Sequence, residues 1–339
     1  MKNLLQGRSN SIGIILLIIA ILFIGWFERT QPGGRDFGDL TGDILTFNTV
    51  VRIGLFTIVV VGLNLLMGYA GQVSLGQAAF YGLGAYVSAI FTTRGLAFGL
   101  PEGLVMSWWW PWLLIVAGML LTGGFTYLVG RPILNLKGHY LAMATLGLGI
   151  MIFILFRENF GIKPNVLNIT GGFDGLPDVP RLRIASYEMW PVERYYYLVW
   201  FFTILSLIIS NNIVNSRVGR ALRAIHGSEI AAETIGVDTA QFKIRIFVFS
   251  TMLASLAGSL FAHFQAAISP HPFSFVGSLE LLVMASVGGL GAVWGAPLGV
   301  AIIFTIEELL RSQLHTLGVG SEVEPVVFGL ILVIIMIFL

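Results

Sequence analysis

Ten long apolar stretches cross this chain, and no other feature limits its possible folds so strongly. They fall at about 11–27, 48–67, 74–92, 109–130, 139–156, 195–211, 244–268, 278–291, 295–311 and 325–339. A helix needs about 20 residues to cross the hydrocarbon core of a bilayer. The interruption of 278–311 by Gly-Gly-Leu-Gly and a proline allows either two short helices or one broken helix. We therefore predict an all-α, polytopic membrane protein of nine or ten segments, forming a single transmembrane domain over 1–339.

Composition places the chain in lipid rather than in water. Hydrophobic residues make up 56% of it and charged residues only 11%, whereas about a quarter of the residues of a soluble protein are charged. A water-soluble fold of 339 residues could not bury this much apolar surface, which excludes a soluble enzyme or a nucleic-acid-binding protein. Cysteine is absent, so disulfides, thiolate metal sites and cysteine nucleophiles are excluded as well.

The residues that flank the stretches indicate their orientation. The first stretch follows Lys2 and Arg8 as in a signal peptide, but no small-residue cleavage site comes after it, so we expect it to be retained as a transmembrane segment. Lys and Arg are denser in 1–10, 131–138 and 212–245 than in the segments expected outside. Because loops rich in Lys and Arg stay in the cytoplasm, this modest bias predicts a cytoplasmic N-terminus and a cytoplasmic loop at 212–243.

The chain lacks the residues that common energy-converting and metal sites need. Each of its four lysines is followed by a residue other than Ser or Thr, so none completes a P-loop for ATP hydrolysis. Acids near the stretches lie close to stretch ends, which gives little support to a mid-membrane proton relay; they are Glu280, Glu307 and Glu308. The histidines lie on separate segments and are interpreted as structural rather than metal-binding: His139, His226, His263, His271 and His315.

These exclusions leave a passive channel, an intramembrane enzyme, or the membrane subunit of a transporter that a separate ATPase drives. No pair of polar residues suggests a catalytic centre at mid-depth, which makes the enzyme the weakest of the three. The inner loop at 212–243 favours the transporter subunit, because a short helix in such a loop can dock into a groove on a partner.

The loop at 212–243 carries charges at helical spacings. Arg220 and Arg223 are three residues apart and share one helical face, while Glu229 and Glu233 are four apart and share another. Small alanines separate the acids, and a glycine is suited to end the helix. We expect both acids to face the partner, although a solvated loop with ordinary charge pairs would have the same spacing. The predicted coupling residues are Arg220, Arg223, Glu229, Ala231, Ala232, Glu233 and Gly236.

Five segments together resemble one family. Residues 220–236 are similar to the Glu-Ala-Ala-type coupling region of ABC importer permeases. The other four begin with Asn-Leu-Leu-Met-Gly-Tyr-Ala-Gly-Gln at 64, Leu-Lys-Gly-His-Tyr at 136, Thr-Gly-Gly-Phe-Asp-Gly-Leu-Pro at 170 and Gly-Gly-Leu-Gly-Ala-Val-Trp-Gly at 288. Their order resembles that of branched-chain amino acid ABC permeases, specifically the LivM-type subunits, and the resemblance covers nearly the whole chain from about residue 48.

This resemblance implies a permease subunit in a bacterial inner membrane that moves leucine, isoleucine or valine inward by alternating access. The implied partners are a second, LivH-type permease, two cytoplasmic ATPase subunits and an extracytoplasmic solute-binding protein. The chain itself would hold no cofactor, because ATP is used by the ATPase subunits. Importers of urea or short-chain amides share much of the pattern, so a subunit of such an importer is the alternative within this class.

Two further groups of residues are predicted from the cost of placing polar and small residues in lipid. Glutamine and serine at the mouth of an apolar stretch should face protein or a cavity. We predict that the translocation path passes Asn64, Gln72, Ser74 and Gln77, with hydrogen bonding between helices as the alternative interpretation. Small residues at four-residue spacing let membrane helices approach closely, which predicts helix packing at Gly291, Gly295 and Gly299.

Overall fold

The computed structural model describes residues 2–31, 37–41, 45–134, 136, 138–158, 169–185, 187–316, 327, 329, 330 and 333. In this part of the chain almost all secondary structure is helical, so the predicted all-α fold is confirmed. The helices are α1 (Lys2–Thr30), α2 (Phe37–Thr41), α3 (Phe47–Asn64), α4 (Gln77–Thr93), α5 (Glu102–Val105), α6 (Trp110–Ile133), α7 (His139–Arg157), α8 (Val192–Asn215), α9 (Arg217–Gly227), α10 (Glu229–Thr234), α11 (Thr239–Gln265), α12 (Phe275–Gly288) and α13 (Gly295–Thr316).

Short elements complete the fold. A π-helical turn extends α3 (Leu65–Tyr69), and 3-10 turns lie at Gly95–Phe98, Gly172–Asp174 and His271–Phe273. The strands β1 (Arg183–Ile184) and β2 (Tyr187–Glu188) pair as a small antiparallel hairpin.

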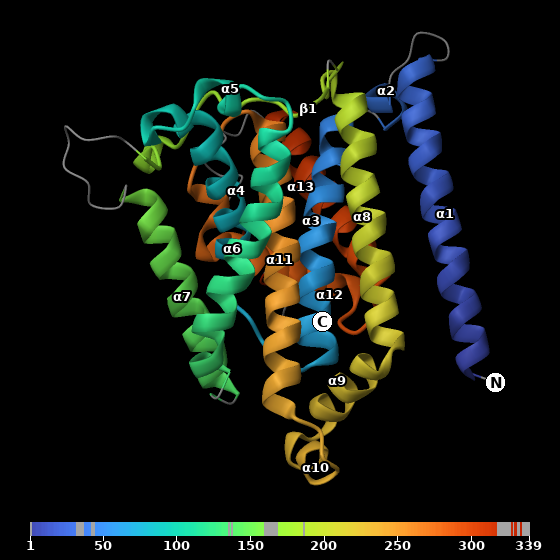
Figure 1. Cartoon of the computed structure of the whole chain (residues 1–339). Coiled ribbons are helices and arrows are strands. Elements are labelled where there is room, and N and C mark those ends of the chain that lie inside the picture. The colour runs from blue at the N-terminus through green and yellow to red at the C-terminus, as the bar shows by residue number, and fades with distance from the viewer. Residues whose placement is uncertain are drawn as a thin grey trace.

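Each of the first nine predicted stretches coincides with a helix (Figure 1). By length and composition, the described residues contain five segments able to cross a membrane: Phe47–Tyr69, α6, α7, α8 and α11. The stretch at 278–311 forms two helices, because Gly289 and Gly291 have φ angles of +90° and +89° and end α12. The tenth stretch, 325–339, lies outside the described residues apart from four isolated positions.

Helices α3 and α11 form the centre of the bundle (Figure 1). In the most apolar part of each helix, 83% of the residues of α3 and 78% of those of α11 are buried. The buried share is only 39% in α6, 28% in α7 and 39% in α8. Helix α11 packs against α3, α4 and α6, while α8 packs between α3 and α1. Helices α6, α7 and α8, at the periphery of the bundle, therefore keep apolar side chains on the surface, as a helix that faces lipid does.

Helices α4 and α11 are in backbone contact at two glycines. A Cβ atom on Gly258 would lie 1.8 Å from the carbonyl oxygen of Tyr81, and one on Gly84 would lie 2.0 Å from that of Ser255. The hydroxyl of Ser259 donates a hydrogen bond to the carbonyl of Gly84 at 2.9 Å. Close backbone approach of this kind is how small residues hold helices together in lipid.

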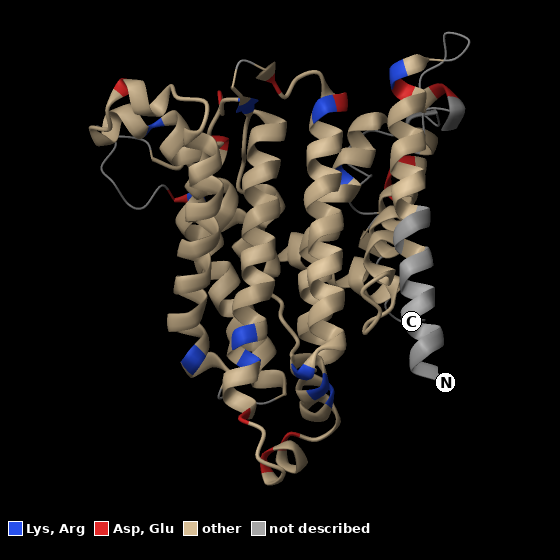
Figure 2. Cartoon of the chain, turned by 45° about the vertical axis from the view of Figure 1, so that its right-hand side comes forward, with Lys and Arg blue, Asp and Glu red and all other residues tan. Residues whose placement is uncertain are grey.

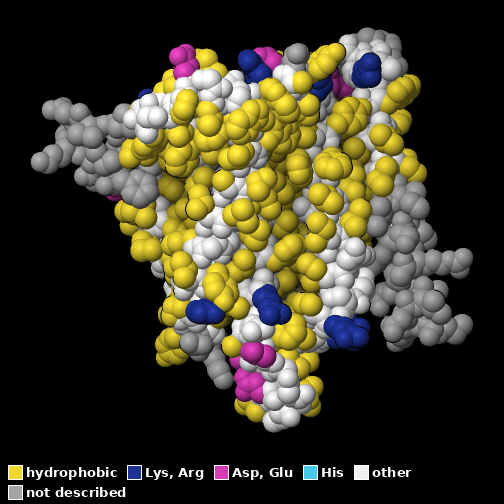
Figure 3. Space-filling model, viewed as in Figure 1, with side chains coloured by type: hydrophobic (Ala, Val, Ile, Leu, Met, Phe, Trp, Pro, Cys, Tyr) yellow, Lys and Arg dark blue, Asp and Glu magenta, His cyan; other side chains and the backbone are white. Residues whose placement is uncertain are grey.

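Charged side chains gather at the two ends of the bundle (Figure 2), and hydrophobic side chains cover the middle of the face seen in Figure 3. Helices α9 and α10 lie at one end, together with the start of α1 (Figure 1). We call this the inner end. The opposite, outer end carries α2, α5 and the β1–β2 hairpin (Figure 1).

Candidate functional site

Two short helices form the inner end between α8 and α11. Helix α9 begins after Ser216, whose hydroxyl oxygen accepts a hydrogen bond from the N–H of Val218 at 3.1 Å. Helix α10 begins after Ser228, whose hydroxyl oxygen accepts one from the N–H of Ala231 at 3.3 Å. Serine is a preferred N-cap because its side chain satisfies an N–H that has no partner within the helix. Local sequence thus explains where both helices start.

Both predicted acids of α10 contact residues of α11, and Glu233 is also exposed at the surface. An Oε1 atom of Glu229 lies 2.5 Å from the Nζ atom of Lys243, which is buried. The Oε1 atom of Glu233 accepts a hydrogen bond from the hydroxyl of Thr239 at 2.8 Å. The ion pair of Glu229 follows from the cost of burying an ammonium group that no carboxylate neutralises. Contact of the two acids with a partner stays a prediction.

The exposed side of α10 also carries two large apolar side chains. The side chains of Ile230 and Ile235 are 71% and 74% exposed. Ala231 is also exposed, whereas Ala232 is buried beneath the helix. The surface that α10 exposes therefore combines two isoleucines with Glu233, while Glu229 forms an ion pair with α11.

Gly236 ends α10 as the sequence predicts. Its φ angle is +84°, and its N–H donates to the carbonyl of Glu233 at 2.9 Å. The next N–H, that of Val237, donates to the carbonyl of Ala232 at 3.0 Å. These two bonds form a Schellman motif. The motif favours glycine at the position of Gly236, because the residue there adopts a left-handed backbone conformation.

The two predicted arginines have different surroundings. Arg220 is exposed at the inner end. Arg223 is exposed as well, and its Nη2 atom donates a hydrogen bond to the carbonyl of Val214 at 3.2 Å. It also lines a cavity of about 400 Å³, together with Tyr69 and Asn215. Both arginines are thus exposed at the inner end, and Arg223 also contacts the end of α8.

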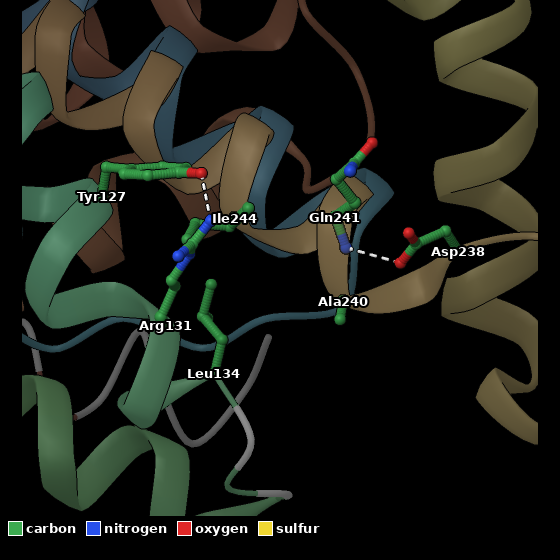
Figure 4. Close-up of a pocket in the computed structure, with 7 residues that line it drawn as sticks. All are labelled: Tyr127, Arg131, Leu134, Asp238, Ala240, Gln241 and Ile244. Carbon is green, nitrogen blue, oxygen red and sulfur yellow. Dashed lines mark hydrogen bonds between the residues drawn. The ribbon is translucent and has the colours of Figure 1, made fainter.

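A second inner-end cavity, of about 380 Å³, lies between α6 and α11 (Figure 4). On one wall Arg131 donates a hydrogen bond to the hydroxyl of Tyr127, and its guanidinium carbon lies 4.5 Å from the centre of that ring. On the other wall Asp238 accepts a hydrogen bond from the N–H of Gln241 at 3.0 Å and caps α11. The cavity thus borders the start of α11, the helix with which α10 forms its ion pair.

The four predicted path residues lie where α3 passes into α4. Residues 70–76 leave the helical conformation there, and such backbone is tolerated within a membrane only where it is buried in protein or lines a cavity. The Nδ2 atom of Asn64 donates to the carbonyl of Ala292 at 3.2 Å. The Nε2 atom of Gln77 donates to the carbonyl and the hydroxyl of Ser250 at 3.2 and 3.0 Å.

Polar atoms at this junction are buried without a hydrogen-bond partner among the described residues. They are the Oδ1 atom of Asn64, both amide atoms of Gln72, the Oγ atom of Ser74 and the Oε1 atom of Gln77. None of these side chains is more than 2% exposed. Buried polar groups are usually paired, and unpaired ones are costly. This cost distinguishes the junction from the inner end, where the charged groups of α10 and α11 are paired.

The three predicted packing glycines do not lie on one helix. Gly295 and Gly299 belong to α13, where added Cβ atoms would lie 1.8 Å from the carbonyl oxygen and 2.6 Å from the nitrogen of Gly288. Gly291 lies in the preceding turn, with a φ angle of +89°. A Cβ atom on Gly68 would lie 2.2 Å from the nitrogen of Gly291. Because α13 begins only at Gly295, Gly291 permits a turn and a loop contact instead of continuing the helical spacing.

Sequence reasoning missed Lys243, Thr239 and Ser250. Glu229 and Lys243 are 14 residues apart and Gln77 and Ser250 are 173 apart, so no helical spacing links them. One signal was available for Lys243, since it lies between phenylalanine and isoleucine at the start of an apolar stretch. A lysine in such a position is seldom buried unless it is paired.

His263 links three parts of the outer half. Its Nε2 and Nδ1 atoms hydrogen-bond to the hydroxyl of Ser88 at 2.8 Å and the carbonyl of Pro180 at 2.6 Å. These contacts join α11 to α4 and to the segment before β1. Within the described ranges, no three histidine, aspartate or glutamate side chains gather as a metal site would require.

Comparison with known proteins places these features in a family context. Residues 45–338 match the family model of the branched-chain amino acid transport system permease component. The high-affinity branched-chain amino acid permease protein LivM of Escherichia coli K12 is 28% identical over 98% of this chain and 75% of its own length.

Two further relatives extend the comparison. The LivH permease protein of Escherichia coli K12 is 24% identical over 86% of this chain and 92% of its own length. A probable LivM permease protein of Methanocaldococcus jannaschii is 24% identical over 84% and 88%. No solved structure matches the chain.

Proposed function

The chain belongs to the branched-chain amino acid transport system permease family, and from that premise we propose that it is the LivM-type permease subunit of an ABC importer that carries leucine, isoleucine and valine into the cell. The observation that carries this proposal is the extent of the similarity. The family model matches residues 45–338, and the alignment with the LivM protein of Escherichia coli K12 covers 98% of this chain. The multi-spanning helical bundle is consistent with a membrane permease.

The proposed complex contains a second, LivH-type permease, two cytoplasmic ATPase subunits and an extracytoplasmic solute-binding protein, in a bacterial inner membrane. Similarity of this chain to both LivM and LivH proteins supports a pair of related permeases. The ATPases would be separate chains, because no lysine of this chain completes a P-loop. The inner end, with the N-terminus, would face the cytoplasm. The loops at this end are the ones that are rich in Lys and Arg, and such loops stay in the cytoplasm.

Coupling in this proposal runs from α10 into the bundle. An ATPase would contact the exposed Ile230 and Ile235. The ion pair between Glu229 and Lys243 would transmit displacement of α10 to the start of α11. Helix α11 also bears Ser250, which accepts two hydrogen bonds from Gln77. Movement of α11 would therefore reach the junction of α3 and α4, where the predicted path residues lie.

The proposal is tested with the chain co-expressed with its second permease and ATPases and reconstituted in liposomes with the binding protein. We expect uptake of radiolabelled leucine, isoleucine and valine that requires ATP, and no uptake of urea. ATP-dependent uptake of urea or a short-chain amide in their place would overturn the substrate assignment and identify the alternative importer.

The ATPase assignment has its own measurement. The purified chain alone should show no ATP turnover, whereas the complete complex should hydrolyse ATP faster when substrate-loaded binding protein is added. Turnover by the lone chain, retained after repeated purification, would contradict the assignment of hydrolysis to partner subunits.

A further inference from the structure

An apolar cavity of about 550 Å³ lies between α1 and the rest of the bundle. Every residue that lines it is glycine, proline or a hydrophobic residue, and these residues come from α1, α2, α3, α8 and α13 and from two connecting segments. Helix α1 forms one wall at the edge of the bundle, beside α8 (Figure 1). We call this space the α1 cavity, after Gly13, Leu17, Ala20, Ile21 and Ile24, which α1 contributes.

The depth of the α1 cavity corresponds to one leaflet of a membrane. Residues 13–24 span about 17 Å along α1 at about 1.5 Å per residue, and half of the hydrocarbon core of a bilayer is about 15 Å thick. A Cβ atom on Gly13 would lie 3.8 Å from the indole ring of Trp294, which marks one end of the cavity. The opposite end reaches Phe37 of α2, at the outer end of the bundle (Figure 1). The cavity therefore runs lengthwise along α1.

Few molecules could fill this space. Water needs about two to four polar partners, which an apolar lining does not supply, and an empty void of this size would forfeit many dispersion contacts. A transmembrane helix about 10 Å wide and 30 Å long occupies roughly 2,400 Å³, about four times the volume of the cavity. Leu298 lines the cavity and is 65% exposed, so the cavity opens to the surroundings of the bundle. A flexible acyl chain from the bilayer fits these limits.

A polar cavity meets the α1 cavity at Trp294, which lines both. It is the inner-end cavity of about 400 Å³ that Arg223 lines with Tyr69 and Asn215, and we call it the Arg223 cavity. No aspartate or glutamate lines it, and Arg223 forms no ion pair within the described part of the chain. Its positive charge can therefore meet an anion. Basic pockets between transmembrane helices on the cytoplasmic side bind anionic lipid head groups in this way.

We propose that the two cavities together bind one anionic phospholipid of the inner leaflet, with its phosphate on Arg223 and one acyl chain in the α1 cavity. The polar cavity lies at the inner end and the apolar cavity extends from it toward the outer end, which is the order of head group and chain in a leaflet. Trp294 would lie between the two, at the level that tryptophan prefers in membranes. A zwitterionic amino acid fits less well, because no carboxylate lines either cavity to meet its ammonium group.

This inference goes beyond the proposed transport function and does not depend on which solute is carried. Only the assignment to the inner leaflet rests on the proposed orientation of the chain. The phospholipid would touch α1, α8, α9 and α13 at once, so it would complete the contact of α1 with the bundle.

The test uses the full chain, alone and in complex with its second permease and ATPases, purified in detergent and stripped of lipid. Native mass spectrometry counts the bound molecules during titration with dioleoyl-phosphatidylglycerol or dioleoyl-phosphatidylcholine, which have the same chains. Both preparations should bind one phosphatidylglycerol about tenfold more tightly than phosphatidylcholine, because choline offsets the charge that Arg223 meets. Glycerol phosphate carries the charge without the chains and should not displace the lipid.

Variants of the Arg223 cavity test the head group. Arg223→Gln should remove the preference for phosphatidylglycerol, whereas Arg223→Lys keeps the charge and should retain most of it. Arg220→Gln is the matched control, because Arg220 is exposed on the same helix and does not line the cavity.

Variants of α1 test the acyl chain. Leu17→Trp fills part of the α1 cavity and should weaken binding of both lipids about tenfold. Leu22→Trp is the matched control, because Leu22 is 56% exposed on α1 and does not line the cavity. The wild-type chain offers a measurement without substitution. Phosphatidylglycerol with brominated chains should quench its tryptophan fluorescence more than phosphatidylcholine with the same chains, since Trp200 and Trp294 line the α1 cavity.

Several outcomes would overturn the site. Equal binding and equal quenching by the two lipids would remove the role of Arg223, and displacement by glycerol phosphate would leave only a phosphate site. Unchanged affinity in Leu17→Trp would place the chain elsewhere. Binding by the lone chain but not by the complex would mean that the second permease covers the cavities. Failure of the complete system to transport any branched-chain amino acid would instead refute the proposed function and leave the lipid titration unaffected.

Discussion

The inner end and the junction of α3 with α4 use polar residues in opposite ways. At the inner end, Glu229 is paired with Lys243 and Glu233 with Thr239, so the charged groups of α10 are satisfied within the chain. At the junction, the side chains of Gln72 and Ser74 are buried, and their polar atoms have no hydrogen-bond partners among the described residues. Paired groups fix the geometry of a connection, whereas unpaired ones remain able to bind a solute or to exchange partners. We infer that the first region transmits force and the second responds to it.

The largest expected effect concerns the packing that supports the junction. Gly258→Ala should destabilise the chain by about 3 kcal/mol, because the new methyl group would overlap the carbonyl oxygen of Tyr81, 1.8 Å away. Thermal unfolding of the purified complex measures the loss. Gly227→Ala at the inner end is the control, since no atom lies within 4 Å of its added methyl group. Equal stability of the two variants would show that the junction is no more tightly packed than the inner end.

A second prediction concerns the ion pair at the inner end. Lys243→Met leaves Glu229 without its partner and should cost about 2 kcal/mol, less than a fully buried pair because the Glu229 side chain is 26% exposed. We expect uptake to fall more than ATP hydrolysis, because α10 would no longer move α11. The ratio of substrate transported to ATP hydrolysed measures this coupling.

Exchange of the two charges separates coupling from simple stability. The double variant Glu229→Lys with Lys243→Glu keeps an ion pair and should recover much of the lost coupling ratio, while each single variant should not. If the single variants transport with a normal ratio, the pair only supports the fold and force enters α11 elsewhere.

The third prediction concerns the unpaired polar groups of the junction. The chain has no cysteine, so single cysteines at Gln72, Ser74 and Gln77 can be labelled without background. A water-soluble thiol reagent should react with them severalfold faster in one nucleotide state of the complex than in another. Protection of all three in every state would leave helix packing as their role and would remove the contrast between the two regions.

The smallest expected effect concerns the exposed side of α10. Ile230→Ser should weaken binding of the ATPase subunits by about 1 kcal/mol, or roughly fivefold, while leaving the chain itself stable. Met106→Ser at the outer end is the control, because Met106 is 70% exposed and Ile230 is 71% exposed. A pull-down titration measures both. Equal affinity in the two variants would mean that the isoleucines do not form the contact.

Much of the architecture could be predicted from the chain alone. Nine apolar stretches coincide with helices, because backbone groups in lipid must hydrogen-bond within their own segment. Caps at Ser216, Ser228 and Gly236 follow from local chemistry, and they bound α9 and α10. The candidate site was less predictable, since the direction of Glu229 depends on a lysine on another helix.

The sequence by itself therefore determined the class of protein, the helices and the residues that carry polarity. Hydrophobic period, cap residues and glycines act over a few positions and can be read without knowledge of the fold. Only the tertiary structure decided which polar groups meet. Asn64 reaches Ala292 across 228 residues, and Glu229 of α10 pairs with Lys243 of α11. Contacts between distant parts of the chain depend on how helices pack, and packing is decided by many weak contacts together rather than by any local motif.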